Sequence, residues 1–277
     1  MEFNLDPVFF SLGPLQVRWY GLMYVIGFVW ATMVGKKLVD EGFFPVKKQD
    51  VDTLITYSMI GIFLGARIAY VFIYNWDHYI NNPSEIWAIW KGGLSYHGAF
   101  AGLFFALLLF AKRVKLSVLQ VWDAGVLMGA LSVFFGRLGN FINGELWGRV
   151  SDVPWAFIFP TGGASPRHPS QLYEAVGEGL IVFIILWTLK NRMTISGILA
   201  SWYPILYGIA RFSVEFFREP DVQMGYYLGF LTMGQILCLL MIALGIGVRF
   251  YATKRNLVIQ TSKTPFKVSM SGVKSSG

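Results

Sequence analysis

Seven long apolar stretches alternate with shorter polar ones along the chain. Several of them are close to the ~20 residues that a helix needs to cross a ~30 Å hydrocarbon core, so they predict membrane-spanning helices. The predicted spans are Val17–Lys36, Val51–Tyr74, Tyr96–Ala111, Leu119–Phe135, Leu172–Leu189, Ile198–Phe217 and Thr232–Tyr251. We therefore expect an all-α integral membrane protein, a bundle of seven transmembrane helices preceded by an interfacial segment, residues 1–16.

Lysines and arginines are distributed unevenly between the loops. Groups of them follow the first, third, fifth and seventh predicted spans, whereas the alternate loops hold only Lys91, Arg149, Arg167 and Arg218. Because positive charge marks the cytoplasmic side, we expect the N-terminus outside and the C-terminus in the cytoplasm. The spans would form one polytopic domain, residues 1–252. A basic cytoplasmic tail, residues 253–277, would follow, and its polar composition predicts disorder.

Composition agrees with a membrane protein and excludes several other classes. Hydrophobic residues make up 55% of the 277 positions and charged residues 14%, against about a quarter charged in soluble domains. The net charge of +7 would suit nucleic acid, but its placement follows membrane topology, so we expect no nucleic-acid partner. The single cysteine, Cys238, excludes an intrachain disulfide and a Cys-rich zinc site. The first sixteen residues lack the features of a cleavable signal peptide.

Pairs of glycines four residues apart recur within the predicted spans. Such small residues let two helix backbones approach closely, so they predict tight helix packing. The three pairs are Gly61/Gly65, Gly98/Gly102 and Gly125/Gly129.

Polar residues gather in the stretch Gly136–Gly148, which we place in a glycine-rich polar outer loop after the fourth span. Arg137, Asn140, Asn143 and Glu145 stand there among four glycines. Polar groups at membrane depth are costly, so each normally has a partner or a task. Arg137 carries a planar fork of donors that suits phosphate or carboxylate, and with no carboxylate three or four residues away we expect it to be unpaired. A glycine-rich hinge whose polar groups satisfy one another is the alternative.

The sixth predicted span carries a polar stripe. Tyr203, Tyr207, Arg211 and Glu215 recur every four residues and therefore share one helix face. Such a stripe must face a cavity or another helix rather than lipid. The alternative is an Arg211–Glu215 pair that only neutralises itself.

Further candidates lie near the outer ends of the other spans. His97 stands in Gly-Gly-Leu-Ser-Tyr-His-Gly. Histidine can accept a proton near physiological pH, although a lone histidine at a helix end is more often structural. Tyr20 and Tyr24 share one face of the first span, where they either belong to an aromatic belt or line a cavity. Arg67 adds a cation to the second span.

These segments resemble those of a known family. The stretch Gly136–Gly148 is similar to the signature of bacterial prolipoprotein diacylglyceryl transferases, in which an Arg, an Asn-Phe-x-Asn core and a following Glu and Gly stand in this order. Tyr20 in Trp-Tyr-Gly-Leu-Met-Tyr, the segment around His97, residues 167–174 and Arg211 in Gly-Ile-Ala-Arg-Phe also resemble family segments, in family order. The resemblance covers residues 6 to 247, approximately.

The resemblance implies a multi-pass transferase of the bacterial plasma (inner) membrane. Such an enzyme moves the diacylglyceryl group of phosphatidylglycerol onto the lipobox cysteine of a prolipoprotein signal peptide, forming a thioether and releasing glycerol phosphate. Its partners would be phosphatidylglycerol, prolipoprotein signal peptides and the lipid bilayer. The reaction requires no metal and no organic cofactor, and we expect none.

The same resemblance assigns roles to the candidate residues. The expected catalytic residues are Arg137, Arg211, His97 and Tyr20. The expected substrate-binding residues are Arg137, Asn140, Asn143, Glu145, Gly148, Tyr207 and Glu215. The cations would stabilise a departing phosphate, and a base must take the thiol proton because the thiolate is the nucleophile. His97 is the first candidate for that base, with Tyr20, Tyr207 or the phospholipid's own phosphate as alternatives.

Two other classes fit part of the sequence. A transporter or channel for an anionic solute would use Arg137 and Arg211 along its pathway. The odd number of spans and the lack of matching halves count against that class. A seven-span receptor or scaffold would leave several intramembrane charges without a task.

Overall fold

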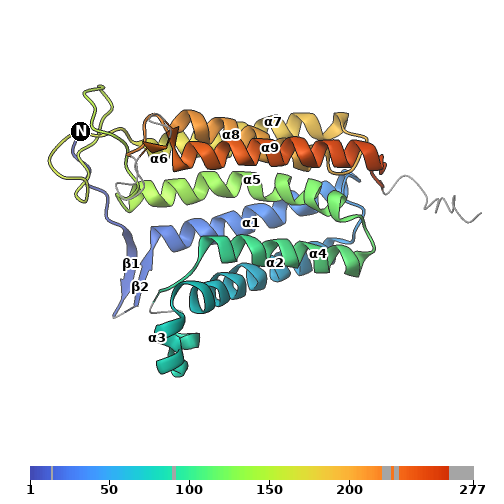
Figure 1. Cartoon of the computed structure of the whole chain (residues 1–277), viewed down its shortest axis with the longest axis horizontal. Helices are drawn as coiled ribbons and strands as arrows, with labels where there is room; N and C mark the ends of the chain where they lie inside the picture. Colours follow the sequence, from blue (N-terminus) through green and yellow to red (C-terminus); the bar gives the residue numbers. More distant parts are fainter. Residues whose placement is uncertain (14, 89–91, 220–225, 228–230, 262–277) are drawn as a thin grey trace, which may run out of the picture.

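The long helices lie side by side with their axes roughly parallel, forming one bundle (Figure 1). This computed structural model describes residues 1–13, 15–88, 92–219, 226–227 and 231–261. The long helices are α1 (Trp19–Asp40), α2 (Lys48–Ala69), α4 (Tyr96–Val114), α5 (Val118–Ile142), α7 (Val182–Leu189), α8 (Ile198–Val214) and α9 (Met233–Arg255). The prediction of a mostly helical protein is confirmed.

Shorter helical segments extend or connect these helices. They are the π-helices η1 (Tyr70–Tyr74) and η4 (Ala175–Ile181), the 3₁₀-helices η2 (Pro83–Trp87) and η5 (Lys190–Arg192), and the short α-helices α3 (Trp76–Asn81) and α6 (Ser170–Glu174). The π-helix η4 joins α6 to α7, so these elements form one continuous helical segment. Wide turns of this kind are rare and occur often at functional sites.

Six helical segments of the described chain are long and apolar enough to cross a membrane. They are Trp19–Asp40, Lys48–Tyr74, Tyr96–Val114, Val118–Ile142, Ser170–Arg192 and Met233–Arg255. The seventh predicted span corresponds to α8, whose 17 residues lie at the lower limit of the ~17–25 that cross a membrane. A count of seven therefore stays a prediction.

Large apolar side chains cover the outside of these helices. Val29 on α1, Phe105 on α4 and Leu244 on α9 are each more than half exposed, at 54%, 60% and 61%. Exposed apolar surface on this scale marks contact with a membrane or another protein. Because six such helices stand together, we describe the chain as a multi-pass membrane protein.

The two ends of the bundle differ in what they carry. The N-terminus, the loop after α5 and the hairpin β1–β2 lie at one end, and α9 finishes at the other (Figure 1). We call the first the arginine end, because Arg137 and Arg211 lie toward it, and the second the tail end. The N-terminus of the chain and the C-terminal end of α9 therefore lie at opposite ends of the bundle (Figure 1). An odd number of crossings requires this arrangement. Which side faces the cytoplasm stays a prediction.

Two short antiparallel hairpins accompany the helices. Strand β1 (Val8–Leu12) pairs with β2 (Leu15–Arg18), and β3 (Tyr226–Tyr227) pairs with β4 (Leu231–Thr232). Much of the predicted interfacial segment 1–16 is therefore a hairpin. Strand β1 reads Val-Phe-Phe-Ser-Leu and does not alternate between apolar and polar residues, so the sequence gave no clear sign of the hairpin.

The first part of the predicted tail, up to residue 261, has a defined structure. Helix α9 continues to Arg255. Beyond it, Ser196 N donates to Leu257 O at 2.8 Å, and Ile259 N donates to Thr194 O at 2.9 Å. Residues 257–261 therefore pack on the loop before α8. Residues 262–277 lie outside the described residues, so disorder there stays a prediction.

Glycines bring α2 and α4 into close contact, as two of the three predicted pairs require. A Cβ added at Gly102 would overlap the carbonyl of Gly61, and one at Gly98 would overlap the carbonyl of Gly65. The third pair behaves differently. A Cβ at Gly125 would meet only Leu107, at 3.9 Å, and one at Gly129 would meet no described atom within 4 Å. The prediction of close packing is wrong at that pair, because within the described residues no backbone atom of another helix lies within 4 Å of an added Cβ.

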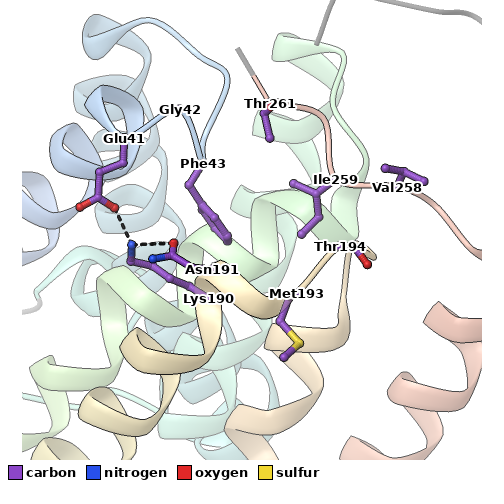
Figure 2. Close-up of a pocket in the computed structure, with 10 residues that line it drawn as sticks. All are labelled: Glu41, Gly42, Phe43, Lys190, Asn191, Met193, Thr194, Val258, Ile259 and Thr261. Carbon is purple, nitrogen blue, oxygen red and sulfur yellow. Dashed lines mark hydrogen bonds and ion pairs between the residues drawn. The ribbon is translucent and has the colours of Figure 1, made fainter. Parts of the chain in front are cut away.

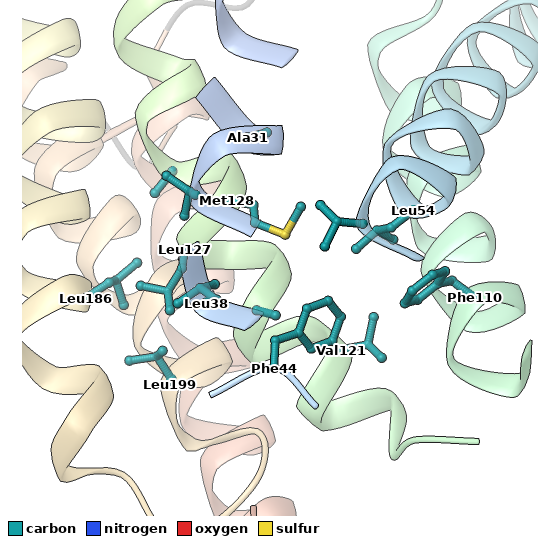
Figure 3. Close-up of a cluster of buried hydrophobic side chains, with 14 of the residues drawn as sticks. Ala31, Leu38, Phe44, Leu54, Phe110, Val121, Leu127, Met128, Leu186 and Leu199 are labelled. Atoms are coloured by element: carbon teal, nitrogen blue, oxygen red, sulfur yellow. The ribbon is translucent and has the colours of Figure 1, made fainter. Parts of the chain in front are cut away.

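The main apolar core occupies the tail half of the bundle (Figure 3). Phe44, in the loop after α1, and Phe110, near the end of α4, are fully buried. Val121 and Leu199, in the first turns of α5 and α8, are fully buried as well. This arrangement leaves the arginine half of the bundle for polar groups.

Candidate active site

Helix α5 places Arg137 on a regular helix rather than in a loop. The helix runs to Ile142, with Asn143 as its C-cap. The prediction that the span ends at Phe135 and gives way to a glycine-rich loop is therefore wrong for residues 136–142. Gly139 is needed for packing, since a Cβ there would lie 2.9 Å from a ring carbon of Tyr20. The chain leaves the helix only at Gly144, which has a φ of +65°.

Arg137 is held by two carboxylates, so the prediction that it is unpaired is wrong. Its Nε lies 2.8 Å from Glu174 Oε2, and its Nη2 lies 3.4 Å from Glu178 Oε2. Glu174 ends α6 and Glu178 lies in η4. Both glutamates are about forty residues away along the chain. Sequence spacing within one helix therefore gave no sign of these partners.

Arg211 has the predicted partner and a second one. It forms an ion pair with Glu215, one helical turn further along α8. Its Nε also lies 3.7 Å from Glu178 Oε1. Glu178 thus stands between Arg137 and Arg211 and links α5 to α8.

Arg218 completes the group, although the sequence analysis assigned it no role. Its Nη1 lies 2.5 Å from Glu174 Oε1, and its Nε lies 3.6 Å from Glu215 Oε2. Thr232, the N-cap of α9, donates its hydroxyl to Glu215 Oε1 at 2.7 Å. We call these residues the arginine–glutamate cluster: Arg137, Arg211, Arg218, Glu174, Glu178 and Glu215.

The accessible face of the cluster is positive. The side chains of Arg137, Arg211 and Arg218 are 20%, 16% and 15% exposed, whereas Glu174 and Glu178 are 0% exposed. Buried carboxylates compensate the charge of the arginines, which makes three cations tolerable at this depth. A ligand that reaches the cluster therefore meets guanidinium groups, which bind phosphate and carboxylate well.

Tyrosines of α1 and α8 lie near the cluster. The Tyr207 side chain lies close enough to Arg137 and Glu178 to interact electrostatically with both. Tyr203 and Tyr207 pack ring to ring, with centroids 5.9 Å apart. Tyr20 and Tyr24 share a hydrogen bond of 3.0 Å between their hydroxyls, as their spacing predicted. The polar stripe on α8 therefore faces the arginine–glutamate cluster and the neighbouring helical segments, rather than lipid.

The segment after α5 is fixed by its own polar groups. Asn140 and Asn143 both donate to Glu145 Oε1, at 2.9 and 3.2 Å. Gln171 donates to the backbone carbonyl of Glu145 at 2.6 Å. This arrangement matches the alternative in which the polar groups satisfy one another. Substrate binding by these residues stays a prediction.

Gly148 is placed against protein backbone. A Cβ there would overlap the carbonyl of Phe217 and lie 2.8 Å from His168 Cβ. Gly148 N donates to His168 O at 2.9 Å. These contacts explain why glycine is required at position 148, and substrate binding by Gly148 stays a prediction.

His97 lies at the start of α4, with Ser95 as the N-cap of that helix. The side chain is exposed. Its Nδ1 lies 3.3 Å from the Tyr74 hydroxyl. Its described contacts involve no member of the arginine–glutamate cluster. A role as a base stays a prediction.

Arg67, the further cation of the sequence, has a structural role. Nearly buried, it donates to four backbone carbonyls, those of Glu85, Ile86, Gly92 and Gly93. It therefore holds the segment between α3 and α4 against the end of α2, and its donors are not available to a ligand.

A hollow of about 310 Å³ lies at the tail end of the bundle, and Figure 2 shows its lining. Its lining includes Lys190, Glu41 and Asn191. The Lys190 ammonium lies 2.6 Å from Glu41 Oε2 and 3.1 Å from Asn191 Oδ1, so its charge is already compensated. This hollow offers a less favourable anion site than the arginine–glutamate cluster.

Comparison with known proteins identifies the family. The sequence profile described as "Prolipoprotein diacylglyceryl transferase" matches residues 7–251. The chain belongs to the prolipoprotein diacylglyceryl transferase family. The matched range includes all six residues of the arginine–glutamate cluster.

Individual members of the family are similar over nearly the whole chain. A phosphatidylglycerol–prolipoprotein diacylglyceryl transferase of Nitratidesulfovibrio vulgaris is 46% identical over 244 residues, covering 88% of this chain and 93% of its own. Enzymes of the same name from Pseudoalteromonas translucida and Oleidesulfovibrio alaskensis are 46% and 47% identical, covering 95% and 90% of this chain and 97% and 94% of their own.

The sequence analysis missed Glu178 and undervalued Glu174 and Arg218. A signal for the glutamates was present, since they stand four residues apart in an otherwise apolar span. Intramembrane carboxylates mark functional sites by default. Among the described residues, no group of three or more His, Cys, Asp or Glu side chains is arranged to hold a metal ion.

Proposed function

We propose that this chain transfers the diacylglyceryl group of phosphatidylglycerol to the lipobox cysteine of prolipoproteins. The observation that carries the proposal is the positive face of the arginine–glutamate cluster, with three partly exposed arginines above fully buried carboxylates. The relatives are named for this phospholipid and this protein substrate, and the family membership supports the same reaction here.

The reaction needs an anion site and a base. The cysteine sulfur forms a bond to the glyceryl carbon, and the bond from that carbon to the phosphate oxygen breaks. The products are a thioether and glycerol phosphate, and the thiol proton goes to a base. Arg137 and Arg211 stabilise the negative charge that gathers on the leaving phosphate. Fixed cations in a site of low dielectric constant suit this task because they require little reorganisation during the reaction.

His97 is the proposed base, and the thiolate it generates is the nucleophile. His97 Nδ1 lies 3.3 Å from the Tyr74 hydroxyl; in the tautomer that this role requires, Nδ1–H donates to that hydroxyl and Nε2 is unprotonated and free to accept the thiol proton. The change His97→Gln keeps hydrogen bonding but removes basicity. We expect turnover to fall by about tenfold or more. A variant with nearly full turnover between about pH 6 and 9 would assign His97 to a structural role and leave Tyr20, Tyr207 or the phosphate itself as the base.

The remaining assignments concern substrate binding and the membrane. Tyr207 and Tyr20 would contact the phospholipid beside the positive face, and Glu215 fixes Arg211 there. Asn140, Asn143 and Glu145 would bind the polar headgroup from the segment after α5. The uneven loop charges support seven spans in the bacterial plasma membrane, with the arginine end outside. Both substrates are then reached from the bilayer.

Transfer to a synthetic peptide tests the proposed function directly. The purified protein is incubated with phosphatidylglycerol and a peptide that carries a lipobox cysteine. We expect a thioether adduct, seen by mass, and release of glycerol phosphate. A peptide with serine in place of cysteine is the control and should stay unmodified. An active anion flux into vesicles without any adduct would instead support the transporter interpretation.

A further inference from the structure

A buried aspartate ties together the beginnings of the two helices that carry Arg137 and Arg211. Asp123, on α5, is 0% exposed. Its Oδ2 accepts a hydrogen bond from Gly197 N at 2.7 Å, and its Oδ1 accepts one from Ala200 N at 2.7 Å. Gly197 is the N-cap of α8 and has no side chain to cap the helix. Asp123 therefore caps α8 from a neighbouring helix.

The contact is close as well as polar. Gly197 has a φ of +91°, and a Cβ there would lie 3.1 Å from the side chain of Leu119 on α5. Leu119 lies one turn before Asp123 on the same helix. The beginning of α8 is thus pressed against the first turns of α5, and only a glycine fits between them.

The spacing along both helices is equal. Fourteen residues separate Asp123 from Arg137, and fourteen separate Gly197 from Arg211. At about 1.5 Å per helical residue, each interval spans roughly 21 Å. Because α5 and α8 start at one contact and meet again at Glu178, they run in the same direction. A shift of α8 at its first turn would therefore move Arg211 along the helix relative to Arg137.

We propose that Asp123 is a positioning residue that sets the axial register of Arg211 against Arg137. It lies too far from the cluster to touch a substrate, and the fixed start of α8 carries its effect. The expected effect on turnover rests on the proposed function. The position of α8 relative to α5 is a property of the fold and can be measured without it. A displacement of about 1 Å in a catalytic group can cost a hundredfold in rate.

The isosteric change Asp123→Asn tests this role. Asparagine keeps one acceptor but turns an NH₂ group toward the second backbone amide, so one of the two hydrogen bonds is replaced by a repulsive contact. We expect kcat to fall by about tenfold or more, while KM for the lipobox peptide stays within a factor of about two, because the binding surface at the other end is unchanged.

Gln120 offers a matched control one turn earlier on α5. It is 1% exposed, and its side chain binds the backbone of Gln260 through both its donor and its acceptor. Gln120→Leu therefore removes a comparable buried tie, but to a segment that carries no arginine. We expect it to lower the melting temperature in detergent about as much as Asp123→Asn and to leave kcat unchanged. Equal losses of kcat in both variants, or none in either, would overturn the proposal.

A distance measurement makes the test independent of activity. Spin labels at Val29 on α1 and Ile209 on α8, which are 54% and 52% exposed, report the position of α8, in a Cys238→Ala background. Helix α1 is a suitable reference because it packs along α5. We expect Asp123→Asn to shift or broaden the distance by about one residue rise, ~1.5 Å, and Gln120→Leu to leave it unchanged. An unaltered distance in Asp123→Asn would refute the register role even if the unmodified protein transferred no lipid.

Discussion

At the scale of single residues, the arginine–glutamate cluster shows how charge is kept inside an apolar bundle. Each arginine contacts carboxylates from two places in the chain, and each glutamate contacts two arginines. Removing one member leaves a buried opposite charge without compensation, which is strongly destabilising. A variant that keeps the charge therefore tests function more cleanly than one that deletes it.

Arg137→Lys is such a variant. Lysine keeps the positive charge but loses the planar fork that reaches Glu174 and Glu178 together and still faces a phosphate. We expect lipid transfer to fall by about a hundredfold, in line with a loss of ~2–4 kcal/mol of transition-state stabilisation, and Arg137→Ala to abolish detectable transfer. The assay measures peptide lipidation and protein abundance together. A well-folded Arg137→Ala protein that kept more than about a tenth of the normal rate would disprove the assignment.

His168, in the loop after α5, should make the stability of the protein depend on pH. Trp155 Nε1 donates to the Tyr173 hydroxyl at 2.7 Å, and that hydroxyl lies 3.0 Å from His168 Nδ1. Burial lowers the pKa of His168 below its usual value of 6.5. The unfolded chain therefore takes up a proton first as the pH falls. Stability should be complete above about pH 6.5 and should decrease below it, until the folded pKa is reached.

Melting temperatures in detergent between pH 8 and 5 measure this effect. His168→Asn keeps an acceptor for Tyr173 but does not titrate, so the decrease below pH 6.5 should become smaller. His78→Asn is the control, since His78 is exposed on α3 and pairs with Glu85 of η2, away from the loop after α5. An unchanged profile in His168→Asn would contradict the prediction.

At the scale of elements, the glycine contacts between α2 and α4 determine how closely these helices pack. Gly102→Ala places a methyl group onto the Gly61 carbonyl. We expect this change to destabilise the protein by about 1–3 kcal/mol, as overpacking does in well-packed cores. Gly129→Ala makes the same chemical change on α5, where no described atom lies within 4 Å. It should be neutral or slightly stabilising because alanine favours helix. Thermal melting of both variants in detergent decides whether the backbone contact matters.

The elements also show where sequence reasoning succeeded and where it failed. The existence of the apolar helices was predictable, because each carries a long apolar run. Their ends were less predictable: α5 continues seven residues past Phe135 because glycines and asparagines stay helical when neighbouring helices pack against them. The Arg211–Glu215 pair was predictable from its spacing on one helix. The pairs of Arg137 were not, because their geometry depends on how α5 meets η4.

At the scale of the whole molecule, the orientation in the membrane is the main prediction. A reporter that is active only in the cytoplasm, fused after Tyr251, should give a signal. The same reporter inserted near Trp87, in the segment between α3 and α4, should stay silent. The physical reason is the excess of lysine and arginine in the loops at the tail end. Silence after Tyr251 together with a signal near Trp87 would reverse the topology.

The balance of charges in the arginine–glutamate cluster has a consequence for electrical behaviour. Three arginines face three glutamates, so with all six ionised the empty cluster has no net charge on which a transmembrane voltage can act. A charge that crosses the full membrane is worth about 2.3 kcal/mol per 100 mV. A phosphate headgroup that enters from the near interface crosses only a small part of that field. Lipid transfer by this enzyme should therefore continue in cells whose membranes have been depolarised.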